Sequence, residues 1–507
     1  MSSIDPEEVP DDVTDECSSP VVARGTLTNV DPTVSEDEPA EAGQRAERVD
    51  RMPTRAGLDR RKHRSGRSSP WRQLLGTLVA VQLVGLVVVA SIVAARFPVF
   101  SPIDEGAHYS YIQQIAQHGS LPILGKTLAS PQELAISQGV YPRPTTINPH
   151  TDGLAGLSYE AFEPPLYYVT AVPAFDLFGN YLTKVYAVRG YDVLLLTISA
   201  LLCGLLARMV LGRTSFLFGW SVMLSILLLP GVVVRSVTIS NMALATPLVL
   251  AFVAVSWLAW HRHSSRLFLA SGALAGLCVL TELELLVVPV VLLVVLIAEA
   301  WHRRPLPVVV QTWYRTLLPL VGAGLITVAV VAPWIGFNEI HYHMWNAGAI
   351  AVKEQTPIVN PQHLHFSLAS LPGDTVTFLS DPTLPAEWGG AFIGHPFFGY
   401  VEQLLAIAVI PFTVLVALAT VRRRLTVESL ILALPWLGTI GVLWYIRYGE
   451  QWFITSRYYY PELPVWGLFV AGGVLPFVRS PRLPLYLGAL PVAMLALLWV
   501  DLGARFL

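Results

Sequence analysis

The segment QLLGTLVAVQLVGLVVVASIVAARFPVFSPIDEGAHYSYIQQ, residues 73–114, joins a long apolar run to a polar stretch with two adjacent acids. The apolar part, from Leu74 to Ala95, is as long as a helix that crosses a bilayer. Asp104 and Glu105 follow shortly after it. Two carboxylates just outside a membrane are costly to remove from water, so a site that uses a base or a metal ligand explains them better than packing does.

The chain as a whole is also apolar. Of its 507 residues, 53% are hydrophobic and only 14% are charged, which excludes a soluble globular protein of ordinary composition. The sequence predicts an all-α polytopic membrane protein with about eleven transmembrane helices. The expected spans are 73–95, 187–208, 214–233, 241–260, 267–281, 284–300, 316–336, 398–420, 427–446, 461–478 and 483–503.

Basic residues fix the expected orientation. The breaks between spans that this count places in the cytoplasm all carry Arg or His, for example His261 to Arg266 and Arg422 to Arg424, as the positive-inside rule requires. Basic clusters on both sides of 267–300 demand two crossings there, with a turn at Thr281 to Glu284. We therefore expect a plasma-membrane protein with a cytoplasmic N-terminus and the C-terminus outside.

The chain is expected to have two parts. Residues 1–72 form a disordered cytoplasmic tail, first acidic and then basic, because the tail has too little apolar surface to fold. Its basic block orients the first span and does not indicate a nucleic-acid site. Residues 73–507 form the membrane domain, with outer-face loops at 96–186 and 337–397. The amphipathic stretch 107–118 and the apolar stretch 164–178 are expected to be helices that lie in the interface or are partly inserted.

Two further polar segments fall on the outer face. Glu163 precedes Pro164 and Pro165, which start a helix, so it is either an ordinary helix-start acid or part of the site with Asp104. Arg457 and Tyr458 stand at the membrane boundary, where an arginine fork suits a phosphate and a tyrosine suits a sugar. An aromatic belt with an arginine that reaches the interface is the alternative for this pair.

Glu282 and Glu284 lie between two apolar helices. Acids in this position face water or a site, where they bind an acceptor or a cation. The alternative is a turn that reaches water without further function.

Several short motifs together resemble the GT-C membrane glycosyltransferases that use polyprenyl-phosphate sugars, such as protein mannosyltransferases and lipid A aminoarabinose transferases. The resemblance extends from about residue 75 to 480. The matching motifs are DEGAH at 104–108, EPPLYY at 163–168, TISNMALA at 238–245, GLCVLT at 276–281 and SRYYYP at 456–461.

The resemblance implies a function and a set of residues. Asp104 would be catalytic, with Glu105 as its neighbour. Beside these two, the candidate residues for binding the donor phosphate or substrate are His108, Glu163, Glu282, Arg457 and Tyr458. The partners would be a polyprenyl-phosphate-linked sugar, membrane lipids, and a protein, lipid or polysaccharide acceptor. This chain departs from the family at Met242, where an Asp is frequent, and at Glu282, where a Lys is frequent, so its substrate or activity can differ.

The expected reaction is sugar transfer with inversion at the anomeric carbon. A partly buried Asp104 would take the proton of the acceptor hydroxyl, and Arg457 or a divalent cation would stabilise the leaving phosphate. Asp104 and Glu163 are the candidate metal ligands. Two alternatives stay open: a transporter or flippase, and a non-catalytic assembly protein of the cell envelope.

Overall fold

The computed structural model describes residues 70–97, 99–100, 104–130, 158–302, 310–350, 367–370, 426–449, 456–475 and single residues between 482 and 499. The predicted tail, the span 398–420 and most of the loop 337–397 lie outside these residues. The chain divides into the units Met1–Arg67 and Ser68–Leu507, and every described residue belongs to the second.

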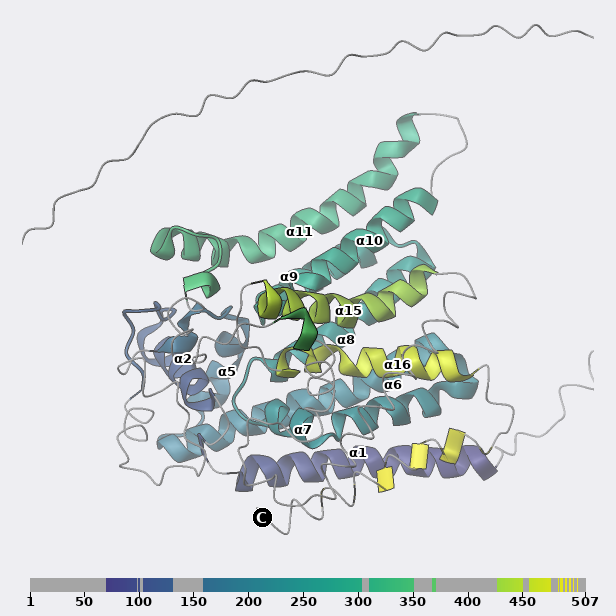
Figure 1. The fold of residues 1–507 in the computed structure, drawn as a ribbon, viewed down its shortest axis with the longest axis horizontal. Coiled ribbons are helices and arrows are strands. Elements are labelled where there is room, and N and C mark those ends of the chain that lie inside the picture. The colour runs from purple at the N-terminus through teal and green to yellow at the C-terminus, as the bar shows by residue number, and fades with distance from the viewer. Residues whose placement is uncertain are drawn as a thin grey trace, which may run out of the picture. The chain divides into compact units, whose positions relative to one another are not determined.

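The regular elements of the described part are helices (Figure 1). In chain order they are α1 (Pro70–Arg96), α2 (Glu105–His118), η3 (Tyr159–Phe162), α5 (Leu166–Asp176), α6 (Tyr181–Leu227), α7 (Pro230–Val237), α8 (Met242–Arg262), α9 (Ser265–Val279), η4 (Leu283–Leu286), α10 (Val287–His302), α11 (Val310–Tyr342), η5 (Leu368–Ser370), α15 (Val427–Tyr448), η7 (Ser456–Glu462) and α16 (Leu463–Val474).

The predicted class, an all-α polytopic membrane protein, is confirmed. Six described helices are long and apolar enough to cross a membrane, whereas the predicted number of about eleven spans is not confirmed. Large apolar side chains such as Val84 of α1 and Leu325 of α11 are exposed, as lipid-facing residues are. The six are Pro70–Arg96, Tyr181–Leu227, Met242–Arg262, Leu283–Trp301, Leu318–Tyr342 and Val427–Tyr448.

The long helix α6 is a hairpin of two helices. Its 47 residues would extend for about 70 Å if straight, more than twice the hydrocarbon thickness of a bilayer. Gly212 interrupts the helix with φ 69°. The indole N–H of Trp220 donates to the carbonyl of Ala200 at 2.9 Å, although 20 residues of straight helix would separate them by about 30 Å. The chain therefore folds back at Gly212, between the two spans that the sequence predicts here.

Small residues let α9 and α11 approach closely. A Cβ atom on Gly272 would lie only 2.2 Å from the carbonyl oxygen of Ala323. The hydroxyl of Thr327 donates to the carbonyl of Gly272 at 2.9 Å. Such contacts drive helix association in a membrane, where no hydrophobic effect acts between helices.

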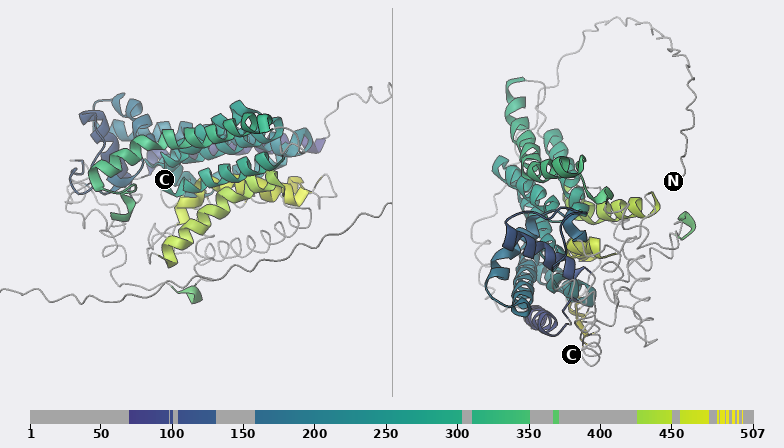
Figure 2. Two further views of the ribbon diagram at one scale, coloured as in Figure 1. Left: turned by 90° about the horizontal axis from the view of Figure 1, so that it is seen from above. Right: turned by 90° about the vertical axis from the view of Figure 1, so that its left-hand side faces the viewer.

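The helices α2 and α5 lie side by side at one end of the long helices, and Figure 2 (right) shows them in front of those ends. Helices at both places are predicted from the sequence and are confirmed. An aromatic core joins them to the start of α6: Tyr109 and Phe175 pack with ring centroids 5.4 Å apart, beside Val188. The backbone N–H of Leu166 donates to the carbonyl of Leu280 at 2.9 Å, so the start of α5 also meets the turn after α9.

Candidate active site

Asp104 stands just before α2 in a left-handed backbone conformation, with φ 72° and ψ −7°. This conformation is uncommon outside glycine, although Asp and Asn adopt it more readily than most residues. The carboxylate does not cap α2 and is buried. It is turned instead toward Arg457, with which it forms a hydrogen-bonded ion pair.

Arg457 comes from η7, 353 residues further along the chain. Besides the bond to Asp104, it donates to the hydroxyl of Tyr458 at 3.1 Å, and its guanidinium carbon lies 5.0 Å from the centroid of that ring. Burial raises the pKa of Tyr458, so this tyrosine is neutral at physiological pH. The Arg457 side chain is 14% exposed, which leaves part of it accessible to a ligand.

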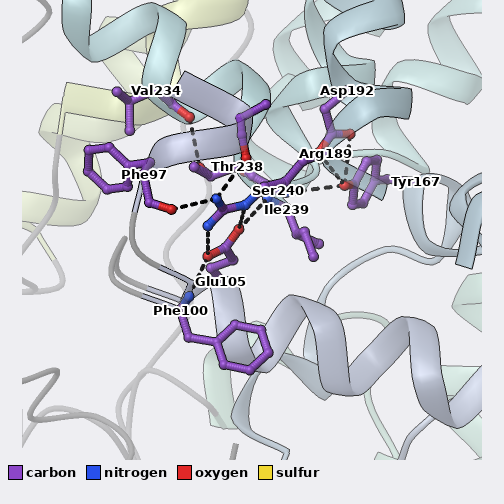
Figure 3. A network of polar contacts seen from close by, with 11 residues as sticks. Phe97, Phe100, Glu105, Tyr167, Arg189, Asp192, Val234, Thr238, Ile239 and Ser240 are labelled. Atoms are coloured by element: carbon purple, nitrogen blue, oxygen red, sulfur yellow. Dashed lines mark hydrogen bonds and ion pairs between the residues drawn. The ribbon is translucent and has the colours of Figure 1, made fainter. Parts of the chain in front are cut away.

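Glu105 lies beside Asp104 in sequence but faces a different partner (Figure 3). Its two oxygens accept from Nε and Nη2 of Arg189, each at 2.7 Å. They also accept the backbone N–H groups of Phe100, at 2.7 Å, and Ile239, at 3.2 Å. Each oxygen therefore has two donors, so Glu105 is bound as a structural carboxylate and does not point at a reacting group.

Glu163 follows η3 and comes before the proline pair that starts α5, as the sequence predicts. It is buried, and its Oε2 accepts from the side-chain amide of Asn241 at 3.2 Å. Burial raises the pKa of Glu163 well above its ordinary value, and the nearby charges of Glu284 and Glu160 raise it further, while Arg457 lowers it. The protonated carboxyl therefore remains present at a higher pH than in an exposed glutamate.

His108 lies one turn into α2. Its Nδ1 is 2.8 Å from the hydroxyl of Tyr168, and the two rings stack with centroids 5.7 Å apart. Tyr168 in turn stacks on Tyr111, with centroids 3.8 Å apart. Burial lowers the pKa of His108 to about 3, so the imidazole is neutral at physiological pH and acts through hydrogen bonding.

Glu282 is fully buried after α9, and neither of its carboxylate oxygens has a hydrogen-bond partner among the described residues. Burial raises its pKa, and the charges of Glu284, Glu462 and Glu163 raise it further. Glu462 is also buried, with one oxygen accepting from the hydroxyl of Thr439 at 3.1 Å. The positive charge of Arg457 lowers the pKa of both Glu282 and Glu163, so Arg457 interacts electrostatically with both acids.

The candidate metal ligands do not form a ligand set. Among the described residues, no group of three or more His, Cys, Asp or Glu side chains is placed to hold an ion. Asp104 is paired with Arg457, and Glu163 with Asn241. We therefore assign no residue to a metal and derive no step through one.

The structure adds Arg189 and Asn241, neither of which the sequence analysis selects. Arg189 is 0% exposed, inside a predicted span. A charged residue in a span is costly and marks a function or a specific partner, so this position carried a usable signal. Asn241 belongs to a motif that resembles the GT-C family, but nothing in the sequence shows that it contacts Glu163.

No family model and no curated protein matches the sequence. Several solved structures are similar to part of this chain. Against ArnT from Cupriavidus metallidurans bound to undecaprenyl phosphate, the TM-score is 0.48 at 15% identity, over 82% of this chain and 63% of that one. Against the same protein in the apo state, the TM-score is 0.45 at 15% identity, over 80% and 60%.

An oligosaccharyltransferase from Archaeoglobus fulgidus, solved with Zn and sulfate, matches with a TM-score of 0.42 at 14% identity, over 82% of this chain and 52% of that one. This chain thus spans less than two thirds of the length of each of these proteins.

Proposed function

We propose that this protein is a membrane glycosyltransferase that moves a sugar from a polyprenyl-phosphate donor to an acceptor hydroxyl at the outer face of the plasma membrane. The observation that carries the proposal is the ion pair of Asp104 with Arg457, a carboxylate and a guanidinium brought together from opposite ends of the membrane domain. A carboxylate can remove the acceptor proton, and a guanidinium fork can hold a phosphate.

In the proposed reaction the donor enters between these two side chains. Its phosphate replaces the Asp104 carboxylate as the partner of Arg457, which frees Asp104 to act as a base. The acceptor oxygen forms a bond to the anomeric carbon while the bond from that carbon to the phosphate oxygen breaks. The electron pair stays on the phosphate beside Arg457, the proton passes to Asp104, and the configuration inverts.

The other residues have supporting roles in this proposal. Neutral His108 and Tyr458 hold sugar hydroxyls, and protonated Glu163 donates a hydrogen bond to the sugar or the phosphate. Glu105 positions Asp104 and does not react. Glu282, where the family often has a cationic side chain, accepts hydrogen bonds from the acceptor, which is a hydroxyl of a protein, lipid or polysaccharide.

The test is sugar transfer in membranes that contain the full chain, supplied with a radiolabelled pool of polyprenyl-phosphate sugars. We expect transfer by the wild type and its loss in Asp104→Asn at equal protein level. Glu299→Gln is the matched control, because Glu299 is a buried acid that hydrogen-bonds His263 at 2.8 Å, and both lie next to predicted cytoplasmic breaks. Equal transfer by the wild type and Asp104→Asn would refute the assigned base and favour an assembly protein or a transporter.

A further inference from the structure

All three nitrogen atoms of the Arg189 guanidinium group donate hydrogen bonds within one small region of the protein. Nε and Nη2 hold Glu105 in a bidentate ion pair at 2.7 Å, and Nη1 donates to the carbonyls of Ala94, at 3.0 Å, and Phe97, at 2.8 Å. Those carbonyls belong to the end of α1 and the residue after it. Arg189 therefore joins the end of the first span, the start of α2 and the start of α6.

Glu105 extends this connection to two more backbone segments. The N–H of Phe100 comes from the segment that follows α1, and the N–H of Ile239 belongs to the link between α7 and α8 (Figure 3). Because Glu105 directly follows Asp104, a carboxylate with four donors fixes the backbone from which the Asp104 side chain departs. The left-handed conformation of Asp104 is retained only if its surroundings determine it.

The link around Ile239 reaches the second acid of the site. The N–H of Ser240 donates to the hydroxyl of Tyr167 at 3.2 Å, and that hydroxyl donates to Asp192 of α6 at 3.0 Å. The side chain of the next residue, Asn241, donates to Glu163 at 3.2 Å. Hydrogen bonds therefore connect Arg189 to Glu105, Glu105 to Ile239 and Asn241 to Glu163, and the backbone of residues 239–241 joins them.

We propose that Arg189 is a positioning residue for sugar transfer, which acts through Glu105 on Asp104 and through residues 239–241 on Glu163. This inference rests on the proposed function. Neither Arg189 nor Glu105 touches the substrate; together they fix where the reacting carboxylate of Asp104 and the supporting carboxyl of Glu163 stand. A misplacement of about 1 Å at a reacting group is enough to reduce turnover by about 100-fold.

The chemistry of the site requires arginine. A lysine keeps the charge but carries one ammonium group, which cannot hold both oxygens of Glu105 and the carbonyls of Ala94 and Phe97 in one plane. A buried ion pair adds little net stability compared with apolar residues of the same volume. Its benefit at this position is therefore the fixed geometry.

The variants Arg189→Lys and Glu105→Gln test this inference. Each should lower kcat about 100-fold and leave the KM for the donor within about twofold, because the donor contacts remain. The kcat of the double variant should be no lower than that of either single variant, because both substitutions break the same ion pair. The profile of kcat against pH should also move in both single variants, because a displaced Glu163 no longer stands at the same distance from Arg457, whose charge lowers its pKa.

The matched control is Gln82→Met. Gln82 is a buried polar residue of α1 whose amide donates to α6, to the carbonyl of Ser221 at 3.0 Å and the hydroxyl of Ser225 at 2.9 Å. It thus joins the same two helices as Arg189 without a contact to Glu105. Gln82→Met should lower thermal stability while kcat per folded protein and the pH profile stay unchanged.

Hydrogen exchange separates failure of this inference from failure of the proposed function. The amides of Phe100 and Ile239 donate to Glu105, so peptides that contain them should exchange faster in Arg189→Lys and not in Gln82→Met. Unchanged exchange, or normal kcat with an unchanged pH profile in Arg189→Lys, would overturn the positioning role and leave the glycosyltransferase proposal standing. Faster exchange in Arg189→Lys, together with no transfer activity in the wild type, would instead refute the proposed function alone.

Discussion

Arg457 donates a hydrogen bond to the carboxylate of Asp104, from a helical turn that lies 353 residues further along the chain. The candidate base and the candidate phosphate ligand therefore neutralise each other in this structure. A donor phosphate has to compete with Asp104 for the guanidinium group. Binding of the donor and release of the base are one event in the proposed mechanism, so the base becomes free only when the sugar is in place.

This competition predicts opposite effects on donor binding. Asp104→Asn removes the negative charge that competes for Arg457, so a short-chain polyprenyl phosphate should bind about tenfold more tightly than to the wild type, although turnover is lost. Arg457→Gln should weaken the same binding by at least about tenfold, because it removes the charged partner of the phosphate. Calorimetry on the detergent-solubilised protein measures both. Weaker binding by Asp104→Asn would contradict the competition.

A second prediction concerns pH. The pKa of Glu163 is raised by burial and by neighbouring acids, so its protonated form persists below the raised value and is lost as the pH increases through it. If this proton holds the sugar or the phosphate, transfer should decline on the alkaline side. Glu163→Gln keeps a hydrogen-bond donor that cannot titrate, so it should retain part of the activity and lose this decline.

His108 provides the control for the pH profile. Burial lowers its pKa to about 3, so it stays neutral from pH 5 to 8 and contributes no titration there. His108→Asn should therefore change the rate without moving the alkaline decline. The measurement is the initial rate of transfer from pH 5 to 9 for the wild type and both variants. An alkaline decline that persists in Glu163→Gln would show that another group controls it.

The sequence predicts the class of fold because hydrophobic length and basic breaks are local signals. The break at Gly212 illustrates this: charged residues on both sides of it mark two spans, and the structure has a hairpin there. The Asp104 and Arg457 motifs are also local. What the sequence does not predict is their contact, which depends on how α2 and η7 meet in three dimensions.

Glu105 shows the limit of reading adjacent residues as one site. Its position next to Asp104 indicates a shared role, yet the two carboxylates belong to different networks. Asp104 faces Arg457, and Glu105 faces Arg189. The partner of Glu105 lies on α6, 84 residues away, and no pattern around either residue specifies that pairing.

Glu282 leads to a prediction about stability. Its raised pKa means that folding favours the protonated acid, so its stabilising contribution is complete below the ordinary pKa of 4.5 and is lost as the pH rises through the folded value. Glutamine does not ionise, so Glu282→Gln does not lose stability at this position as the pH rises. The variant should therefore melt at a higher temperature than the wild type above about pH 6, by the equivalent of about 1–3 kcal/mol, and the difference should grow with pH.

Thermal unfolding in detergent at pH 5, 7 and 9 checks this expectation. The exposed Asp176 at the end of α5 offers a comparison, because replacing it with Asn removes a solvated carboxylate and should change the melting temperature little at any of the three values. A melting temperature of Glu282→Gln that falls below that of the wild type at pH 9 would mean that the ionised Glu282 has a stabilising partner.

The final prediction concerns the contact of α9 with α11. In Gly272→Ala the added Cβ would lie 2.2 Å from the backbone oxygen of Ala323, which cannot move without its helix. The helices must separate, which also stretches the hydrogen bond from Thr327 to the carbonyl of Gly272. We expect a loss of about 1–3 kcal/mol, seen as a lower melting temperature of the solubilised protein.

Gly324→Ala is the matched control, because Gly324 is next to Ala323 on the same helix and a Cβ there meets no atom within 4 Å. Alanine favours the helix over glycine by up to about 1 kcal/mol, so this variant should melt at the wild-type temperature or slightly above it. The contrast between a Gly→Ala change inside the helix contact and one outside it isolates packing from helix propensity. Equal melting temperatures for the two variants would contradict the close approach of α9 and α11.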